Sequence, residues 1–318
     1  MDRPRRILFP TDLSDVSRAA LPYAAQLARG FDAELHVLHV DELHDLSDHW
    51  PNAPGKDELL AALNEETGAL FDRLIASLEK GDGAEHGVRL QRARRRAIAA
   101  GPEILYYAQE KDIDLIVLST HGRRGLSRWV LGSVAEEVVR YTSRPVLTVP
   151  ARAEASQGTR CLVPIDLSEL SLDALRAAAQ LARTTGAELE VFHVVENPMA
   201  PVVVEGYPEI PTVPVEELKR AAQAQIDKLL GKVDLDGLDH SVNLVEGRAK
   251  SAILERIEQG DIGLVVQGSH GASGFTRLLL GSVAAKVMAR ATCPVLTVKH
   301  PKSGAEDEVA AARSQAKS

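Results

Sequence analysis

The 318-residue sequence is poor in cysteine, in aromatic side chains and in long apolar runs. Its two cysteines, Cys161 and Cys293, are too few for a disulfide framework and favour a reducing compartment. No apolar stretch approaches the roughly 20 residues of a membrane-spanning helix, and residues 1–10 hold no apolar core of a secretory signal. The net charge of −8 argues against broad binding to nucleic acid. These absences predict a cytoplasmic protein that binds neither membrane nor nucleic acid.

The sequence does contain an internal duplication. Residues 7–40 align with 161–194 at a constant offset of 154, and 20 of the 34 pairs are identical. Residues 112–149 align with 261–298 at an offset of 149, with 19 of 38 identical. A period of roughly 150 residues is the size of an ordinary domain rather than of a solenoid repeat. We therefore predict a first domain over 1–150, a small polar linker over 151–159, a second domain over 160–300 and a flexible tail over 301–318.

Each half alternates short apolar strands with helices. In the first half we expect strands at 5–9, 33–40, 88–92, 115–118 and 145–149. One helix is expected to begin after Ser14, and three more span 57–79, 102–111 and 133–141. The second half repeats this with strands near 161–163, 187–194, 241–245, 264–267 and 294–298. Continuous apolar runs in the central strands are typical of a parallel sheet covered on both faces. The predicted class is α/β, with two tandem, doubly wound, Rossmann-like domains, each with a five-stranded parallel sheet in the order 3-2-1-4-5.

A glycine loop follows the fourth expected strand in each half. The loops read Ser119-Thr120-His121-Gly122 and Gly268-Ser269-His270-Gly271, and after nine residues each reaches a Gly-Ser pair, Gly132-Ser133 and Gly281-Ser282. Glycine lets a backbone approach a ligand closely, and a helix that opens at Gly-Ser offers N–H groups to an anion. Ligands of such sheets bind at the carboxyl ends of the strands, near the switch point of the strand order. The first strand ends there too, at Asp12 and Asp166, so the sequence predicts one phosphate site in each domain.

These features resemble the universal stress protein family, in its tandem, nucleotide-binding form. The resemblance rests on the Pro-x-Asp-x-Ser run after the first strand, the His-Val end of the second strand, the glycine loop and the closing Pro-Val-Leu-Thr-Val strand. It covers about residues 5–149 and 160–299. The family motif Gly-x2-Gly-x9-Gly-[Ser/Thr] is complete in the second half, whereas Ser119 replaces the first glycine in the first half.

The resemblance implies that the loops wrap the phosphates of ATP, with the presence of Mg²⁺ left open. Asp12 and Asp166 are expected to bind the ribose hydroxyls, and Val40 and Val194 to line the adenine pocket. Ser282 is expected to cap its helix and to donate a hydrogen bond from its hydroxyl to a phosphate oxygen. The implied nucleotide-binding residues are Asp12, Val40, Ser119, His121, Gly122, Gly132, Ser133, Asp166, Val194, Gly268, His270, Gly271, Gly281 and Ser282.

Simpler roles stay open for several of these residues. Each Asp can form an Asx turn at the strand end, and His121 and His270 can serve loop packing alone. The Cβ and hydroxyl of Ser119 are expected to crowd the base or ribose and to weaken the first site.

Two groups of arginines concentrate positive charge in the first half of this acidic chain. Arg123, Arg124 and Arg128 would add positive charge at the first loop. The run Arg92-Ala93-Arg94-Arg95-Arg96 is either a solvated basic face or a contact for a polyanion.

The preferred function is an ATP-binding module with a stress-response or signalling role and no catalytic residue. The chain has no Gly-x4-Gly-Lys-[Ser/Thr] loop and no kinase signature, although slow ATP hydrolysis or phosphotransfer stays open. The other alternative is a dimerising, partner-binding module with vestigial nucleotide sites. In the family the closing strand forms the dimer contact, so the resemblance implies a pseudo-dimer of the two domains within one chain and leaves a homodimer open.

Overall fold

The structure, a computed structural model, describes residues 3–42, 56–79, 88–120, 131–151, 158–196, 214–270 and 280–299. These residues form two compact units, one that ends at residue 151 and one that begins at residue 158. We call them the first and the second domain. Within the described residues, no helix is long and apolar enough to cross a membrane.

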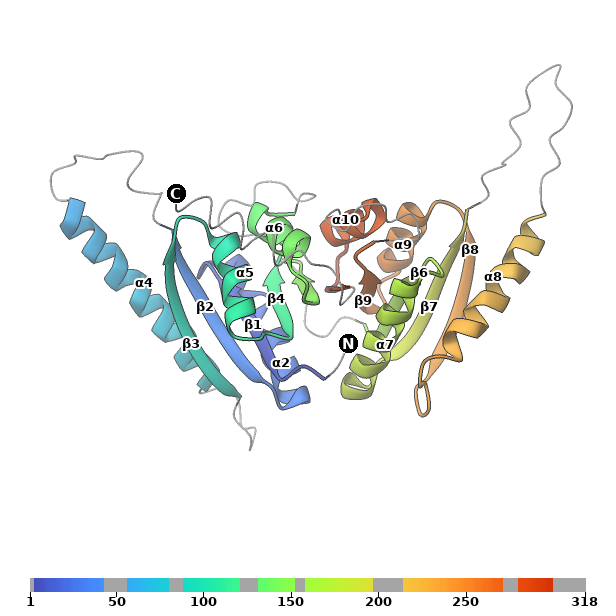
Figure 1. The fold of residues 1–318 in the computed structure, drawn as a ribbon, viewed down its shortest axis with the longest axis horizontal. Helices are drawn as coiled ribbons and strands as arrows, with labels where there is room; N and C mark the ends of the chain where they lie inside the picture. Colours follow the sequence, from blue (N-terminus) through green and yellow to red (C-terminus); the bar gives the residue numbers. More distant parts are fainter. Residues whose placement is uncertain are drawn as a thin grey trace, which may run out of the picture. The chain divides into compact units, whose positions relative to one another are not determined.

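The two domains repeat one order of helices and strands (Figure 1). The first contains β1 (Arg6–Thr11), α1 (Asp15–Arg18), α2 (Leu21–Phe31), β2 (Glu34–Glu42), α4 (Lys56–Glu79), β3 (Arg89–Ala97), α5 (Ala100–Glu110), β4 (Leu115–Ser119), α6 (Ser133–Tyr141) and β5 (Val146–Val149). The second contains β6 (Arg160–Ile165), α7 (Glu169–Thr185), β7 (Glu188–Val195), α8 (Val215–Leu230), β8 (His240–Glu246), α9 (Ala249–Glu258), β9 (Ile262–Gly268), α10 (Ser282–Arg290) and β10 (Val295–Val298).

The strands of each domain pair in parallel. Their order is β3-β2-β1-β4-β5 in the first domain and β8-β7-β6-β9-β10 in the second. The predicted α/β class is confirmed, and each domain has the order 3-2-1-4-5. Helices cover both faces, because alternate side chains of β2 meet different helices: the ring of His39 faces Phe71 of α4, whereas His36 contacts Tyr107 of α5.

A proline near the end of the central strand accompanies an early end to strand pairing. β1 pairs with β2 from Arg6 to Thr11 but with β4 only at Ile7 and Leu8. In the same way, β6 pairs with β9 only as far as Leu162. Pro10 and Pro164 lie two residues after Leu8 and Leu162 and have no N–H to donate to a neighbouring strand. The two central strands thus part before their carboxyl ends, where the order of the sheet reverses. The first strand runs on through the proline, two residues beyond its predicted end at Phe9.

One helix expected after Ser14 is two helices. The N-cap is confirmed, because the Ser14 Oγ accepts a hydrogen bond from the Ser17 N–H at 3.1 Å. The helix is interrupted before Leu21 because Pro22 has no N–H to donate to the carbonyl four residues earlier. Arg176 occupies the equivalent position of the second domain, and α7 is continuous there.

The arginine run lies in β3, the edge strand of the first domain's sheet and longer than expected. Arg94 donates to both oxygens of Asp41 at 2.7 and 2.9 Å. Arg95, on the other face, donates to Glu110 at 2.9 and 3.0 Å and lies over the Tyr107 ring. The charges of Arg94 and Arg95 are thus matched by carboxylates of the same domain. Charged side chains on an edge strand also oppose pairing with another chain.

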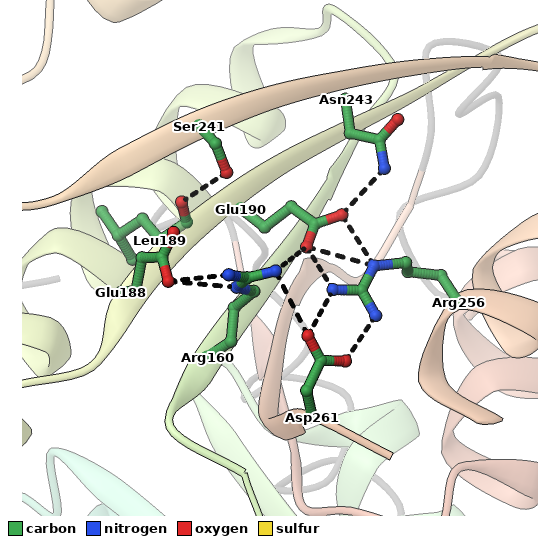
Figure 2. A network of polar contacts seen from close by, with 8 residues as sticks. All are labelled: Arg160, Glu188, Leu189, Glu190, Ser241, Asn243, Arg256 and Asp261. Atoms are coloured by element: carbon green, nitrogen blue, oxygen red, sulfur yellow. Dashed lines mark hydrogen bonds and ion pairs between the residues drawn. The ribbon is translucent and has the colours of Figure 1, made fainter. Parts of the chain in front are cut away.

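The second domain contains a buried ionic network at the amino end of its sheet (Figure 2). Arg256 of α9 and Glu190 of β7 are 7% and 3% exposed and join at 2.6 Å. Arg256 also donates to Asp261 at 2.6 Å, and Asn243 donates to Glu190 at 3.0 Å. Burial raises the pKa of Glu190, but the hydrogen bonds from Arg256 and Asn243 outweigh it and hold the pKa below its usual value.

The first domain has a neutral pair of side chains in place of this ion pair. His36 and Tyr107 occupy the positions equivalent to Glu190 and Arg256, and the His36 Nδ1 lies 2.9 Å from the Tyr107 hydroxyl. Burial lowers the pKa of His36, against the opposing effect of Glu34, and thus favours the neutral ring. The two domains therefore share one strand order but differ in the chemistry that joins the second strand to the helix after the third strand, α5 or α9.

This difference predicts unequal costs of removing one partner. Arg256→Met leaves the Glu190 carboxylate buried without its main partner and should destabilise the second domain by about 3–5 kcal/mol. Tyr107→Phe removes one neutral hydrogen bond and should cost the first domain about 1 kcal/mol. Urea denaturation followed by limited proteolysis and mass spectrometry assigns each loss to a domain. Equal losses of stability in the two variants would contradict the contrast between an ion pair in the second domain and a neutral pair in the first.

Candidate functional site

The first strand of each domain ends in an Asx turn. The Oδ1 of Asp12 accepts hydrogen bonds from the N–H and the Oγ of Ser14 at 3.0 and 2.6 Å. The Oδ1 of Asp166 accepts the same two bonds from Ser168 at 3.1 and 2.5 Å. The Asx turn that the sequence left open is therefore present in both domains. It holds each carboxylate at the carboxyl end of the central strand.

The residue inside each turn has a left-handed backbone. Leu13 and Leu167 have φ values of 65° and 67°. A residue with a Cβ pays about 1–2 kcal/mol for this conformation, and a bulky side chain there is uncommon. Such strain persists only where the surroundings enforce it, and it gathers at functional sites. Sequence reasoning missed this feature because leucine gives no signal for a left-handed residue.

A histidine of the second strand fixes the end of the first. The Nδ1–H of His39 donates to the Thr11 carbonyl at 2.8 Å, and that of His193 donates to the Ile165 carbonyl at 2.9 Å. The carbonyls belong to the last strand residues before Asp12 and Asp166. The histidines were expected only as part of a sequence pattern, and the structure gives them this role.

The two predicted adenine-pocket valines lie beside the Asx turns. Thr11 pairs with His39 and Ile165 with His193, so the next residue along the second strand comes level with each Asp. These next residues are Val40 and Val194, and both are half-buried. The structure thus brings the predicted ribose and adenine residues to one edge of each sheet.

The two ends of each glycine loop are pinned by backbone hydrogen bonds. In the second domain the Ser269 N–H donates to the Val298 carbonyl at 3.0 Å, and the Gly281 N–H donates to the Ser269 carbonyl at 2.8 Å. Thr120 makes the equivalent bonds with Val149 and Gly132 at 2.9 and 2.8 Å. The start of α6 or α10 is thereby held against the end of β4 or β9. His121, Gly122, Arg123, Arg124, Arg128 and Gly271 lie outside the described residues.

Glycine, not serine, caps the helix after each loop. Gly132 and Gly281 are the N-cap residues, with φ values of −61° and −58°, and neither helix has a side-chain cap. Ser133 and Ser282 are the first helical residues, so the predicted capping role of Ser282 is wrong. Without a side-chain cap, the first N–H groups of α6 and α10 are available to an anion.

The Ser119 departure from the motif is matched by a change in packing. A Cβ at Gly268 would lie 2.8 Å from the Cγ of Leu170 in α7. The residue equivalent to Leu170 in the first domain is Val16, which is smaller. Ser119 is buried, and α1, which carries Val16, packs on β4. The domain that has a serine at this position thus has the smaller residue on the neighbouring helix, and the expected crowding of the base or ribose stays a prediction.

His270 presents a buried nitrogen without a partner. Its Nδ1 lies 2.9 Å from the Ser269 hydroxyl, while its Nε2 is buried and has no hydrogen-bond partner among the described residues. Burial and the nearby Lys299 ammonium lower the pKa of His270, which favours the neutral ring. A buried polar atom in a native protein normally has a partner. An anionic ligand at the start of α10 fits this requirement.

Comparison with known proteins identifies the family. The model of the universal stress protein family matches residues 4–150 and again residues 159–299. The chain belongs to the universal stress protein family.

Relatives of this universal stress protein match both its full length and its halves. A universal stress protein of Mycolicibacterium smegmatis is 30% identical over 298 residues, covering 92% of this chain and 96% of that one. Universal stress protein MJ0531 of Methanocaldococcus jannaschii is 35% identical over 145 residues, covering 46% of this chain and 81% of that one. The crystal structure of a universal stress protein from Archaeoglobus fulgidus matches with a TM-score of 0.67 at 25% identity, covering 93% of this chain and 98% of that one.

The matched packing in this universal stress protein predicts a rescue. Gly268→Ser forces Leu170 to move and should destabilise the second domain by about 1–3 kcal/mol, as overpacking does. Adding Leu170→Val recreates the first domain's Ser–Val pair and should restore most of the loss. The free energy of unfolding in urea measures both steps. A neutral Gly268→Ser, or a double variant no more stable than the single one, would contradict this packing account.

Proposed function

We propose that each domain binds an adenine nucleotide, ATP, at the carboxyl end of its sheet, in a stress-response or signalling role. The observation that carries the proposal is one arrangement that occurs twice. A carboxylate held by an Asx turn lies at the end of the central strand, beside a valine of the second strand, Val40 or Val194. An uncapped helix N-terminus is pinned to the end of the neighbouring strand on the other side of the switch point.

Each part of this arrangement suits one part of a nucleotide. The carboxylates of Asp12 and Asp166 accept hydrogen bonds from vicinal hydroxyls such as those of ribose. Val40 and Val194 offer apolar surface to a base. The first N–H groups of α6 and α10, with the hydroxyls of Ser133 and Ser282, donate to phosphate oxygens.

We further propose that the nucleotide is held rather than turned over rapidly. The Oδ1 of Asp166 accepts three hydrogen bonds, from the Ser168 N–H and hydroxyl and from the Ser171 hydroxyl at 2.6 Å. An oxygen so engaged supports the turn and is a poor proton acceptor. ATP bound for storage or sensing supplies charge and shape to be recognised, and Mg²⁺ accompanies it where the phosphates recruit the ion. Pairing of the domains, or of two chains, through the closing strands stays a prediction.

Conservative variants of the two aspartates test the proposal. Asn keeps the acceptor oxygen of the Asx turn but replaces the second carboxylate oxygen with an N–H donor. Asp166→Asn should therefore weaken ATP binding by at least tenfold, the scale of a lost charge-assisted hydrogen bond, without unfolding the domain. Asp12→Asn should remove a smaller share of the total ATP binding, because the first site lacks the first glycine of the motif and is expected to be the weaker one. Calorimetric titration of the full chain with ATP measures both.

The control is Asp236→Asn, a change at an exposed residue that precedes β8 at the opposite end of the sheet. It should leave binding unchanged. Full ATP affinity and stoichiometry in the Asp12→Asn, Asp166→Asn double variant would overturn the proposed site. Equal losses from the two single variants would overturn the ranking of the second site above the first.

A further inference from the structure

Lys299 is a buried lysine at the carboxyl end of the second domain's sheet. It follows the last residue of β10 and is 8% exposed. Among the described residues no carboxylate pairs with it and no acceptor receives a hydrogen bond from it. Burial lowers its pKa to about 8. Lysine is almost never this buried unless an anion compensates its charge.

Backbone hydrogen bonds place Lys299 at the start of the second glycine loop. Its neighbour Val298 accepts from the Ser269 N–H, and the Ser269 carbonyl accepts from Gly281, the N-cap of α10. The ammonium also acts on the next loop residue, because its charge lowers the pKa of His270. Lys299, the His270 imidazole and the N-terminus of α10 are therefore neighbours at the carboxyl end of the sheet.

Each of these three groups favours a negatively charged partner. The first N–H groups of α10 have no side-chain cap. The Nε2 of His270 is buried without a partner in the described part of the chain, and it carries the ring proton when the Ser269 hydroxyl donates to Nδ1. Lys299 adds a full positive charge. A single anionic oxygen cannot satisfy three separate donors as well as a chain of phosphates can.

The first domain has no cation at the position equivalent to Lys299. Thr120 and Val149 make the same backbone hydrogen bond as Ser269 and Val298, but the residue that follows Val149 is Pro150. Proline supplies neither charge nor donor. The two candidate sites thus share these backbone hydrogen bonds and differ in charge at this position.

We propose that Lys299 binds the phosphate chain of the nucleotide at the second site, and that it makes this site prefer nucleoside di- and triphosphates to monophosphates. This inference rests on the proposed nucleotide binding. Ammonium groups suit this task because they are compact charges with three donors that can follow a flexible chain of phosphates. The first site, with Pro150, should discriminate less by the number of phosphates.

The test compares ATP, ADP and AMP in calorimetric titrations of the full chain, in an Asp12→Asn background that weakens the first site. Lys299→Met keeps the length of the side chain and removes its charge. It should weaken ATP binding about tenfold, the scale of one charge-assisted hydrogen bond, and AMP binding less than about twofold. Lys299→Arg should retain most of the preference for ATP, because it keeps the charge.

Lys232→Met is the matched control, since Lys232 is exposed and precedes β8 at the opposite end of the sheet. It should leave the ratio of ATP to AMP affinity unchanged. An unchanged ratio in Lys299→Met would overturn the inference and leave nucleotide binding standing. An equal loss for all three nucleotides would also overturn it, because it would show a structural role. Failure of the unsubstituted chain to bind any of them would overturn the proposed function and this inference together.

Discussion

The candidate sites depend on how the central strand of each sheet ends. A proline without an N–H lies two residues after the last residue that pairs with the neighbouring strand on one side, while pairing with the second strand continues to the end of the first. A histidine of that second strand then binds the last carbonyl, and an Asx turn with a left-handed leucine reverses the chain. Together these contacts hold an aspartate where the strand order reverses, the place at which α/β sheets bind ligands.

The duplicated domains show which positions tolerate change under this constraint. The turn, its serine and the pinned loop are the same in both. Away from them, a buried ion pair in one domain replaces a neutral histidine–tyrosine pair in the other. Ser119 with Val16 replaces Gly268 with Leu170, which are pairs of similar total volume. A site with one fixed frame can therefore acquire different affinities through single residues at its border.

The fold could be predicted because its signals are local and repeated. Apolar runs between turns set the strands, and the duplication confirmed each strand against its copy. The split of the first helix at Pro22 could have been predicted from the proline itself. The left-handed leucines could not, because leucine gives no sequence signal for that conformation. The capping glycines could not, because the hydrogen bonds that place them join residues remote in the sequence. Lys299 was missed because no sequence pattern indicates that a lysine at this position is buried.

The central claim, that this universal stress protein holds ATP, is tested most directly on protein purified without added nucleotide. Denaturing the protein and separating the supernatant by anion exchange gives the amount of ATP, ADP and AMP per chain. ATP close to one or two molecules per chain is the expected result, whereas ADP or AMP alone would point to hydrolysis. Absence of nucleotide, together with no binding when ATP is titrated into the purified chain, would contradict it and favour a partner-binding role with vestigial sites.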